Sequence, residues 1–153
     1  RNGKPRSSVR GETAKVLRAL AARHNPERGW VFMLEAPMDL GGFDGLHAVD
    51  AWAINTFASR GHKRVGYEVK VSRGDWLKEL AHPEKAGYGA WFCDEFYFAC
   101  PAGMIQPAEV PEPYGLVWVS GEGRARMKKR SRLPSHEPTW GAVGRLLRRA
   151  VQE

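Results

Sequence analysis

The segment RVGYEVKVS, residues 64–72, decides the fold that this sequence predicts. Apolar or aromatic side chains at positions 67, 69 and 71 alternate with polar ones, a pattern typical of a β-strand. Because alternate side chains of a strand point to opposite faces, Glu68 and Lys70 share the face that is turned away from the apolar set. We expect this carboxylate and this ammonium to be partly buried near each other, since isolated charges are costly to remove from water.

The segment HAVDAWAIN, residues 47–55, predicts a second strand with a single acidic residue, Asp50. If this strand pairs with residues 64–72 in a meander, Asp50 and Glu68 lie side by side. Adjacent carboxylates repel each other unless a divalent cation lies between them, and hard oxygen ligands suit Mg²⁺ or Mn²⁺. With Lys70 beside the cation, this set suffices for metal-assisted phosphodiester hydrolysis. The alternative is a solvated strand face without catalytic function.

The rest of the chain predicts helices and further strands around this pair. Apolar spacing predicts a helix that begins at Glu12 and ends before Pro26. Further strands are predicted over residues 30–35, 95–100 and 115–120, with a basic segment over residues 124–132, and helices over residues 75–81 and from Thr139 onward. The order of the first elements is helix, three strands, helix and strand. This order predicts an α/β domain in which helices flank a mixed central sheet.

Two helices carry side-chain patterns of their own. The helix over residues 75–81 is expected to place Trp76, Leu77 and Leu80 on one side and to be capped by Ser72. The last helix is expected to have an apolar stripe with arginines largely on the other side. The stripe comprises Trp140, Val143, Leu146, Leu147, Ala150 and Val151, and the arginines are Arg145, Arg148 and Arg149.

The strand over residues 95–100 contains three consecutive aromatic residues, Phe96, Tyr97 and Phe98. Aromatic side chains on a sheet serve as base-stacking platforms in some nucleic-acid-binding proteins. An inner strand of a sheet buries such side chains, so plain packing is the favoured interpretation here.

The chain has 153 residues, which predicts one domain. We expect a basic N-terminal arm over residues 1–11 and a single domain over residues 12–153, with its core over residues 12–100 and a basic extension over residues 121–153. No apolar run approaches the roughly 18 residues of a membrane span. The two cysteines do not form a disulfide framework, which favours a reducing, cytoplasmic location.

The net charge of +7 is unevenly distributed. Residues 1–11 carry four basic residues and no acidic ones, residues 121–153 carry nine and three, and the middle carries eleven and fourteen. Basic ends around an acidic centre suit a polyanion such as DNA, although they are equally consistent with solvated, solubilising tails. The candidate phosphate contacts are Arg73, Lys85, Arg124, Arg126, Lys128, Lys129 and Arg130.

Asp50 followed by Glu68-Val69-Lys70 resembles the signature of the PD-(D/E)xK nuclease superfamily, although Val49 stands where that signature has proline. The αβββαβ core of that superfamily corresponds to residues 12–100, about 60% of the chain. Residues 68–77 and 93–101 are most similar to the MmcB-like DNA-repair proteins of this superfamily. The resemblance therefore implies a restriction-endonuclease-like core.

The resemblance also implies functional assignments. Asp50 and Glu68 would bind Mg²⁺ or Mn²⁺ together with the Val69 carbonyl, and Lys70 would orient or activate the attacking water. Glu12 or Glu35 would be an additional acid, with Glu12 equally suited to complement the dipole of its helix. The implied activity is that of a metal-dependent DNA endonuclease in DNA repair or phage DNA metabolism. A non-catalytic nucleic-acid-binding module on the same fold is the alternative, and the resemblance leaves open whether the active form is a homodimer.

Overall fold

Six strands form one mixed sheet whose spatial order follows the chain, β1-β2-β3-β4-β5-β6. The computed structural model describes residues 6–38, 47–134 and 136–152. The strands β1, β2 and β3 pair antiparallel, β3, β4 and β5 pair parallel, and β6 returns antiparallel to β5. The strands are β1 (Trp30–Met38), β2 (His47–Asn55), β3 (Arg64–Val69), β4 (Glu95–Pro101), β5 (Gly115–Val119) and β6 (Ala125–Lys129).

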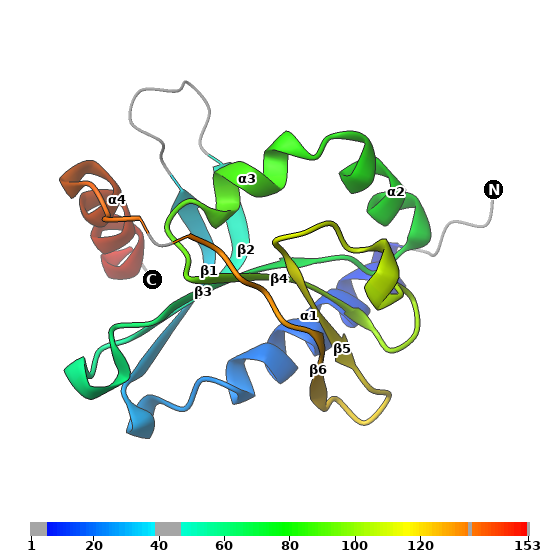
Figure 1. The fold of residues 1–153 in the computed structure, drawn as a ribbon. Helices are drawn as coiled ribbons and strands as arrows, with labels where there is room; N and C mark the ends of the chain where they lie inside the picture. Colours follow the sequence, from blue (N-terminus) through cyan, green and yellow to red (C-terminus); the bar gives the residue numbers. More distant parts are fainter. Residues whose placement is uncertain (1–5, 39–46, 135, 153) are drawn as a thin grey trace.

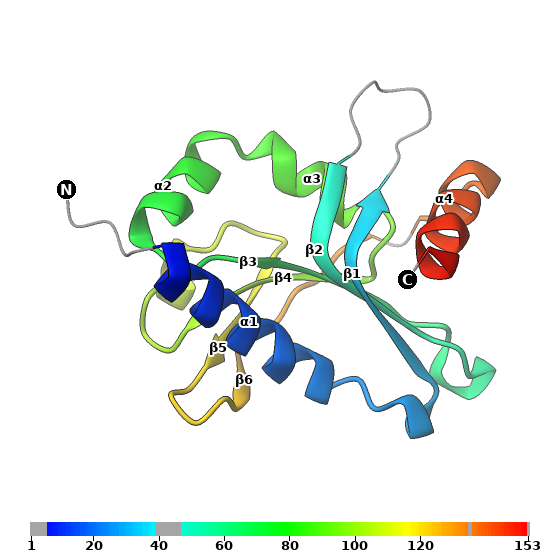
Figure 2. The same ribbon diagram turned by 180° about the vertical axis from the view of Figure 1, so that it is seen from behind.

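Helices cover both faces of this sheet, so the structure has the α/β organisation that the sequence predicts (Figure 1). On one face α1 crosses the central strands, and on the other α2 and α3 follow one another, as Figure 2 shows from behind. The last helix, α4, lies beside β1 at the edge of the sheet. The helices are α1 (Arg6–Ala22), α2 (Arg73–Ala81), α3 (Glu84–Ala90) and α4 (Trp140–Val151), with short 3₁₀ turns at Pro26–Arg28, Ala58–Arg60 and Pro107–Glu109.

Two apolar clusters lie on opposite sides of the sheet and meet at β4. Phe96 and Phe98 belong to the cluster beneath α2 and α3, whereas Tyr97 and Ala99 belong to the cluster beneath α1. Residues 95–100 are all buried. This burial confirms the packing interpretation of the aromatic strand, because none of its rings is presented to a partner.

Several predicted boundaries differ from the observed ones. The first helix begins at Arg6 rather than at Glu12, so residues 6–11 are helical and not part of an arm. The physical reason is that Val9 packs against the α1-side cluster and extends the apolar stripe of the helix by one turn. The strand over residues 64–72 ends at Val69. Residues 1–5 of the predicted arm lie outside the described part of the chain.

The helix α3 was not predicted because glycines disfavour helices in isolation. Its Gly89 packs directly against β2: an added Cβ would lie 2.7 Å from the Val49 side chain. Close approach of α3 to the sheet therefore requires a residue without a side chain, and packing outweighs propensity.

Two predicted helix faces are wrong in part. On α2, Trp76 is fully buried, but Leu77 and Leu80 are exposed, and the inward position belongs to Glu79. On α4, Trp140 is 88% exposed. The expected caps are present, since the Ser72 hydroxyl accepts from the Asp75 N–H and the Thr139 hydroxyl accepts from the Ala142 N–H. None of the described helices is long and apolar enough to cross a membrane.

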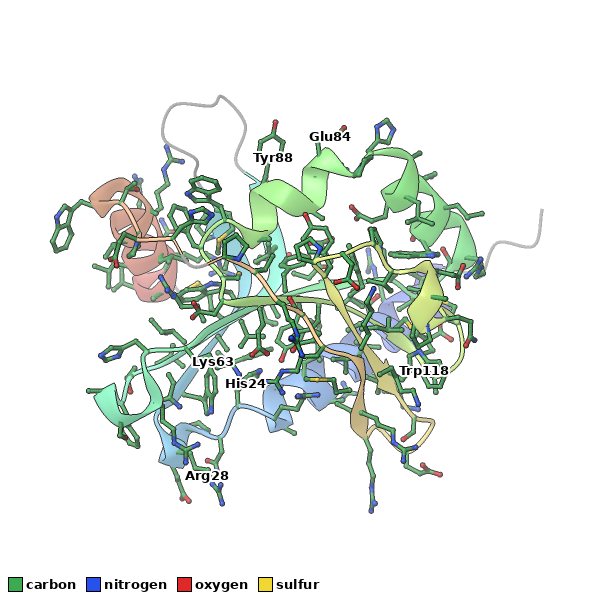
Figure 3. All side chains as sticks on the ribbon, viewed as in Figure 1. His24, Arg28, Lys63, Glu84, Tyr88 and Trp118 are labelled. Carbon is green, nitrogen blue, oxygen red and sulfur yellow. The ribbon has the colours of Figure 1, made fainter. Side chains whose placement is uncertain are left out.

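A buried histidine lies in the α1-side core. The Nε2 atom of His24 is 2.7 Å from the Tyr67 hydroxyl, and the ring packs between Trp30 and Phe32 (Figure 3). Burial, assisted by the nearby positive charge of Arg23, lowers the pKa of His24 from 6.5 to about 4. The imidazole is therefore neutral in the folded protein at neutral pH.

This burial predicts a loss of stability in mild acid. The unfolded chain binds a proton at His24 below pH 6.5, whereas the folded protein binds it only near pH 4. The free energy of unfolding should therefore fall by up to about 3 kcal/mol as the pH drops through this window. Urea denaturation at several pH values measures the slope, and His24→Gln should remove this part of it. An identical slope in both proteins would contradict the assignment.

Candidate functional site

The site forms where the pairing between β2 and β3 ends. The last paired residues on this side are Ala51 and Tyr67, and Asp50 and Glu68 follow them on the two strands. The N–H of Val69 donates to the Asp50 carboxylate at 2.7 Å, and the N–H of Asp50 donates to the Glu68 carboxylate at 3.3 Å. Two side-chain carboxylates thus replace the missing ladder, and the structure brings Asp50 and Glu68 together as the meander predicted.

Both β1 and β2 change the face that they present to the core at this point. Met33 and Ala36 lie in the same apolar cluster although they are three residues apart, which strict alternation forbids. The intervening Glu35 has a φ of 50°, in the left-handed region, and the register places it opposite Asp50. Glu35, one of the two additional acids suggested by the sequence, therefore lines the same groove as Asp50.

Lys70 is held between Glu68 and one further carboxylate, that of Glu79. Its Nζ atom lies 3.0 Å from Glu79 of α2 and 3.9 Å from Glu68, while its backbone N–H donates to the Ala99 carbonyl. The Glu79 side chain is only 7% exposed, and its second oxygen has no hydrogen-bond partner within the described structure. Sequence reasoning missed Glu79. The signal was an acid three residues after the buried Trp76, on the inner face of α2.

Burial and mutual repulsion perturb these groups. Burial raises the pKa of Glu68 to about 8, and the negative charge of Asp50 contributes in the same direction. Burial also raises the pKa of Asp50, although the Val69 N–H opposes this. Burial alone would lower the pKa of Lys70, but its hydrogen bond to Glu79 and the surrounding negative charges outweigh that effect, and the net pKa is raised. The cluster therefore holds Lys70 as an ammonium and favours an additional cation.

Two cavities open onto these side chains. A pocket of about 160 Å³ is lined by Glu68, Lys70, Glu79 and Lys85. A larger groove of about 790 Å³ lies between the sheet and α4 and includes Glu35 and Asp50. Lys85, a predicted phosphate contact, thus reaches the pocket that contains Glu68 and Lys70. Tyr88, which belongs to the same helix as Lys85, lies on the outer side of α3, away from the sheet (Figure 3).

The donor set at the end of the β2–β3 ladder offers oxygen ligands to a divalent metal. Among the described residues, no group of three His, Cys, Asp or Glu side chains is placed to hold a metal ion. The chemistry nevertheless fits Mg²⁺ or Mn²⁺, because Asp50 and Glu68 offer adjacent hard oxygen ligands. Burial disfavours the ionised form of both carboxyl groups, and a bound cation would supply the missing counter-charge. The Val69 carbonyl and water would complete such a shell.

The other predicted residues are spread over the molecule. Glu12 lines a separate pocket with Val16 and Pro101 on the α1 side, away from Asp50. Arg73 forms an ion pair with Glu109 at 2.8 Å. The structure therefore brings neither of them to the carboxylate pair.

The basic residues of β6 lie at the far edge of the sheet from β1 and are largely engaged. Lys129 pairs with Glu112 and Arg130 pairs with Glu95, each at 3.2 Å. Lys128 sits over the Trp118 ring, 4.6 Å from its centroid. The remaining predicted contacts in this segment, Arg124 and Arg126, are exposed.

The overall arrangement has a counterpart among solved structures. The chain is similar to the SPO1766 protein of unknown function from Silicibacter pomeroyi, with a TM-score of 0.62 and 20% sequence identity over 92% of this chain and 87% of that one. No protein-family model and no curated protein matches the chain. A likeness at this level of identity shows a shared fold and carries no statement about activity.

Proposed function

We propose that this protein is a metal-dependent DNA endonuclease with a restriction-endonuclease-like core, acting in DNA repair or phage DNA metabolism. The observation that carries the proposal is the convergence of Asp50, Glu68 and Lys70 at the end of the β2–β3 ladder. The order helix, three strands, helices and strand supports it, because the same order characterises the superfamily that the sequence resembles.

Asp50, Glu68 and the Val69 carbonyl would hold Mg²⁺ or Mn²⁺, which when bound polarises the phosphate and lowers the pKa of water. The chain itself supplies Lys70. Because its ammonium is ion-paired with a buried carboxylate 3.0 Å away, Lys70 keeps its protons. It therefore acts as a donor that orients the attacking water and stabilises charge on the phosphate, and not as a general base. Glu79 positions Lys70 for this task.

Removing the ammonium should abolish cleavage without affecting binding. Lys70→Ala is expected to lower the cleavage rate by about 100-fold or more, since it removes a donor aimed at developing charge. The measurement is a nuclease assay with Mg²⁺ or Mn²⁺ on supercoiled, linear, single-stranded and branched DNA, with EDTA as the metal-free control. Lys78→Ala, which removes an exposed lysine of α2, should retain full activity. A parallel loss of DNA binding in Lys70→Ala would refute the assignment.

Glu79 offers a test of how Lys70 is positioned. Glu79→Gln keeps the size of the side chain but removes the charge 3.0 Å from Lys70. We expect cleavage to fall by about 10–100-fold, the usual effect of losing an outer-shell partner, while the affinity for DNA stays unchanged. Glu79→Asp should recover part of the rate because it restores the charge. Equal rates in both variants would show that Glu79 contributes only to folding.

A second candidate is a non-catalytic nucleic-acid-binding module on the same fold. It is favoured by the finding that no three candidate ligand side chains converge within the described residues. On this hypothesis the carboxylates only satisfy the backbone N–H groups at the end of the ladder, and the site has no use for a metal.

Metal binding distinguishes the two candidates. A titration with Mn²⁺, measured by calorimetry, should show saturable binding in the wild type because Asp50 and Glu68 need a counter-charge. Asp50→Asn should abolish that binding, whereas Asp75→Asn, at an exposed position of α2, should retain it. Binding that is absent from the wild type, or equal in all three proteins, would favour the non-catalytic module.

A further inference from the structure

The groove between α4 and the sheet is lined on one side by basic residues to which the proposed function assigns no role. Three arginines of α4, Arg145, Arg148 and Arg149, line this groove of about 790 Å³. Across from them lie Glu35 and Asp50 on the kinked part of β1 and β2. The volume is within the range of roughly 300–1,000 Å³ that is typical of ligand pockets.

The orientation of α4 departs in part from what its sequence pattern favours. The helix is fastened to the molecule by the fully buried Ala142, with Leu146 partly buried against the same cluster. Its larger apolar residues Trp140, Leu147 and Val151 are exposed. Arginines three and four residues apart share one face of a helix, and here that face borders the site that contains Asp50.

The charges in the groove favour an anion of a particular kind. The three guanidinium groups outnumber the two carboxylates that line the same groove, so the local balance is positive. A guanidinium presents a planar fork of donors that matches the oxygens of a phosphate, and it keeps its charge under all physiological conditions. A row of such groups that ends at a candidate metal-binding carboxylate fits a phosphodiester backbone better than an isolated anion.

We infer that the arginine face of α4 is the surface on which the DNA backbone binds, with successive phosphates on Arg145, Arg148 and Arg149 and the strand directed toward Asp50. This inference deepens the proposed nuclease function and rests on it. It assigns the main phosphate-binding surface to α4, whereas the sequence predicts it on the basic segment around β6. The basic side chains at positions 128–130 belong to the opposite edge of the sheet, whereas α4 lies beside β1 and lines the groove that contains Asp50.

The test compares two variants that each remove three positive charges. One replaces Arg145, Arg148 and Arg149 with glutamine, and the other replaces Arg124, Arg126 and Lys128. Binding of a fluorescent DNA oligonucleotide is measured by anisotropy in EDTA, where no cleavage occurs. We expect the α4 variant to bind at least about tenfold more weakly, with a salt dependence reduced by roughly two units of slope. The β6 variant should lose far less.

Other outcomes would overturn the inference. Equal losses in the two variants, a larger loss in the β6 variant, or no loss in either would show that α4 is not the main phosphate surface. Competition by polyglutamate as strong as that of unlabelled DNA would show generic attraction of anions rather than recognition of phosphate. If the triple α4 variant unfolds at a lower temperature than the wild type, the single charge reversal Arg148→Glu, at an exposed position, replaces it with the same expectation.

The inference and the proposed function fail in different ways. A wild-type protein that binds DNA through α4 but cleaves none of the substrates with Mg²⁺ or Mn²⁺ would refute the nuclease while leaving the α4 surface established. If the wild-type protein cleaves DNA and the α4 variant binds DNA as tightly as the wild type, the α4 surface alone is refuted.

Discussion

The two hydrogen bonds that join Asp50 to Glu68 and Val69 are the constraint on which the rest of the site depends. Once β2 and β3 stop pairing beyond Ala51 and Tyr67, the N–H groups of Asp50 and Val69 need other acceptors. Carboxylates satisfy them from the neighbouring strand, and this fixes the two acids relative to each other. Satisfying the backbone in this way places negative charge in a half-buried position, where it must be balanced.

The surrounding charges provide part of that balance. Lys70 stands between Glu68 and the buried Glu79, and Lys85 lines the same pocket. Buried ion pairs contribute little to stability, because the cost of desolvation offsets their attraction. One Glu79 oxygen has no hydrogen-bond partner among the described residues, which makes this arrangement still less favourable for folding alone. A cluster that costs stability in the absence of a ligand is typical of a functional site.

The sequence predicts those parts of the structure that local periodicity controls. The strand over residues 47–55, the alternation around Glu68 and Lys70, and the Ser72 cap each depend on a few neighbouring residues. The features that were missed depend on contacts between distant segments. Glu79 lies on the inner face of α2, where it pairs with Lys70, and Gly89 is helical because α3 approaches Val49. Glu35 was among the candidate acids, but the kink of β1 at that residue was not predicted. Of these features, only Glu79 leaves a periodic signal in the sequence, its spacing of three residues from the buried Trp76.

The same electrostatic problem gives the arginines of α4 a role in the proposed function. A cluster of carboxylates repels the polyanion on which a nuclease must act, since both carry negative charge. Lys70 and Lys85 counter this repulsion only inside the small pocket. The groove beside Asp50 has the arginines of α4 on its other wall, and part of the apolar stripe of that helix is exposed. Glu35 and Asp50 and the arginines of α4, separate in the sequence, thus form adjoining walls of one groove. In the proposed function, the arginines would attract phosphate and leave the carboxylates for a metal.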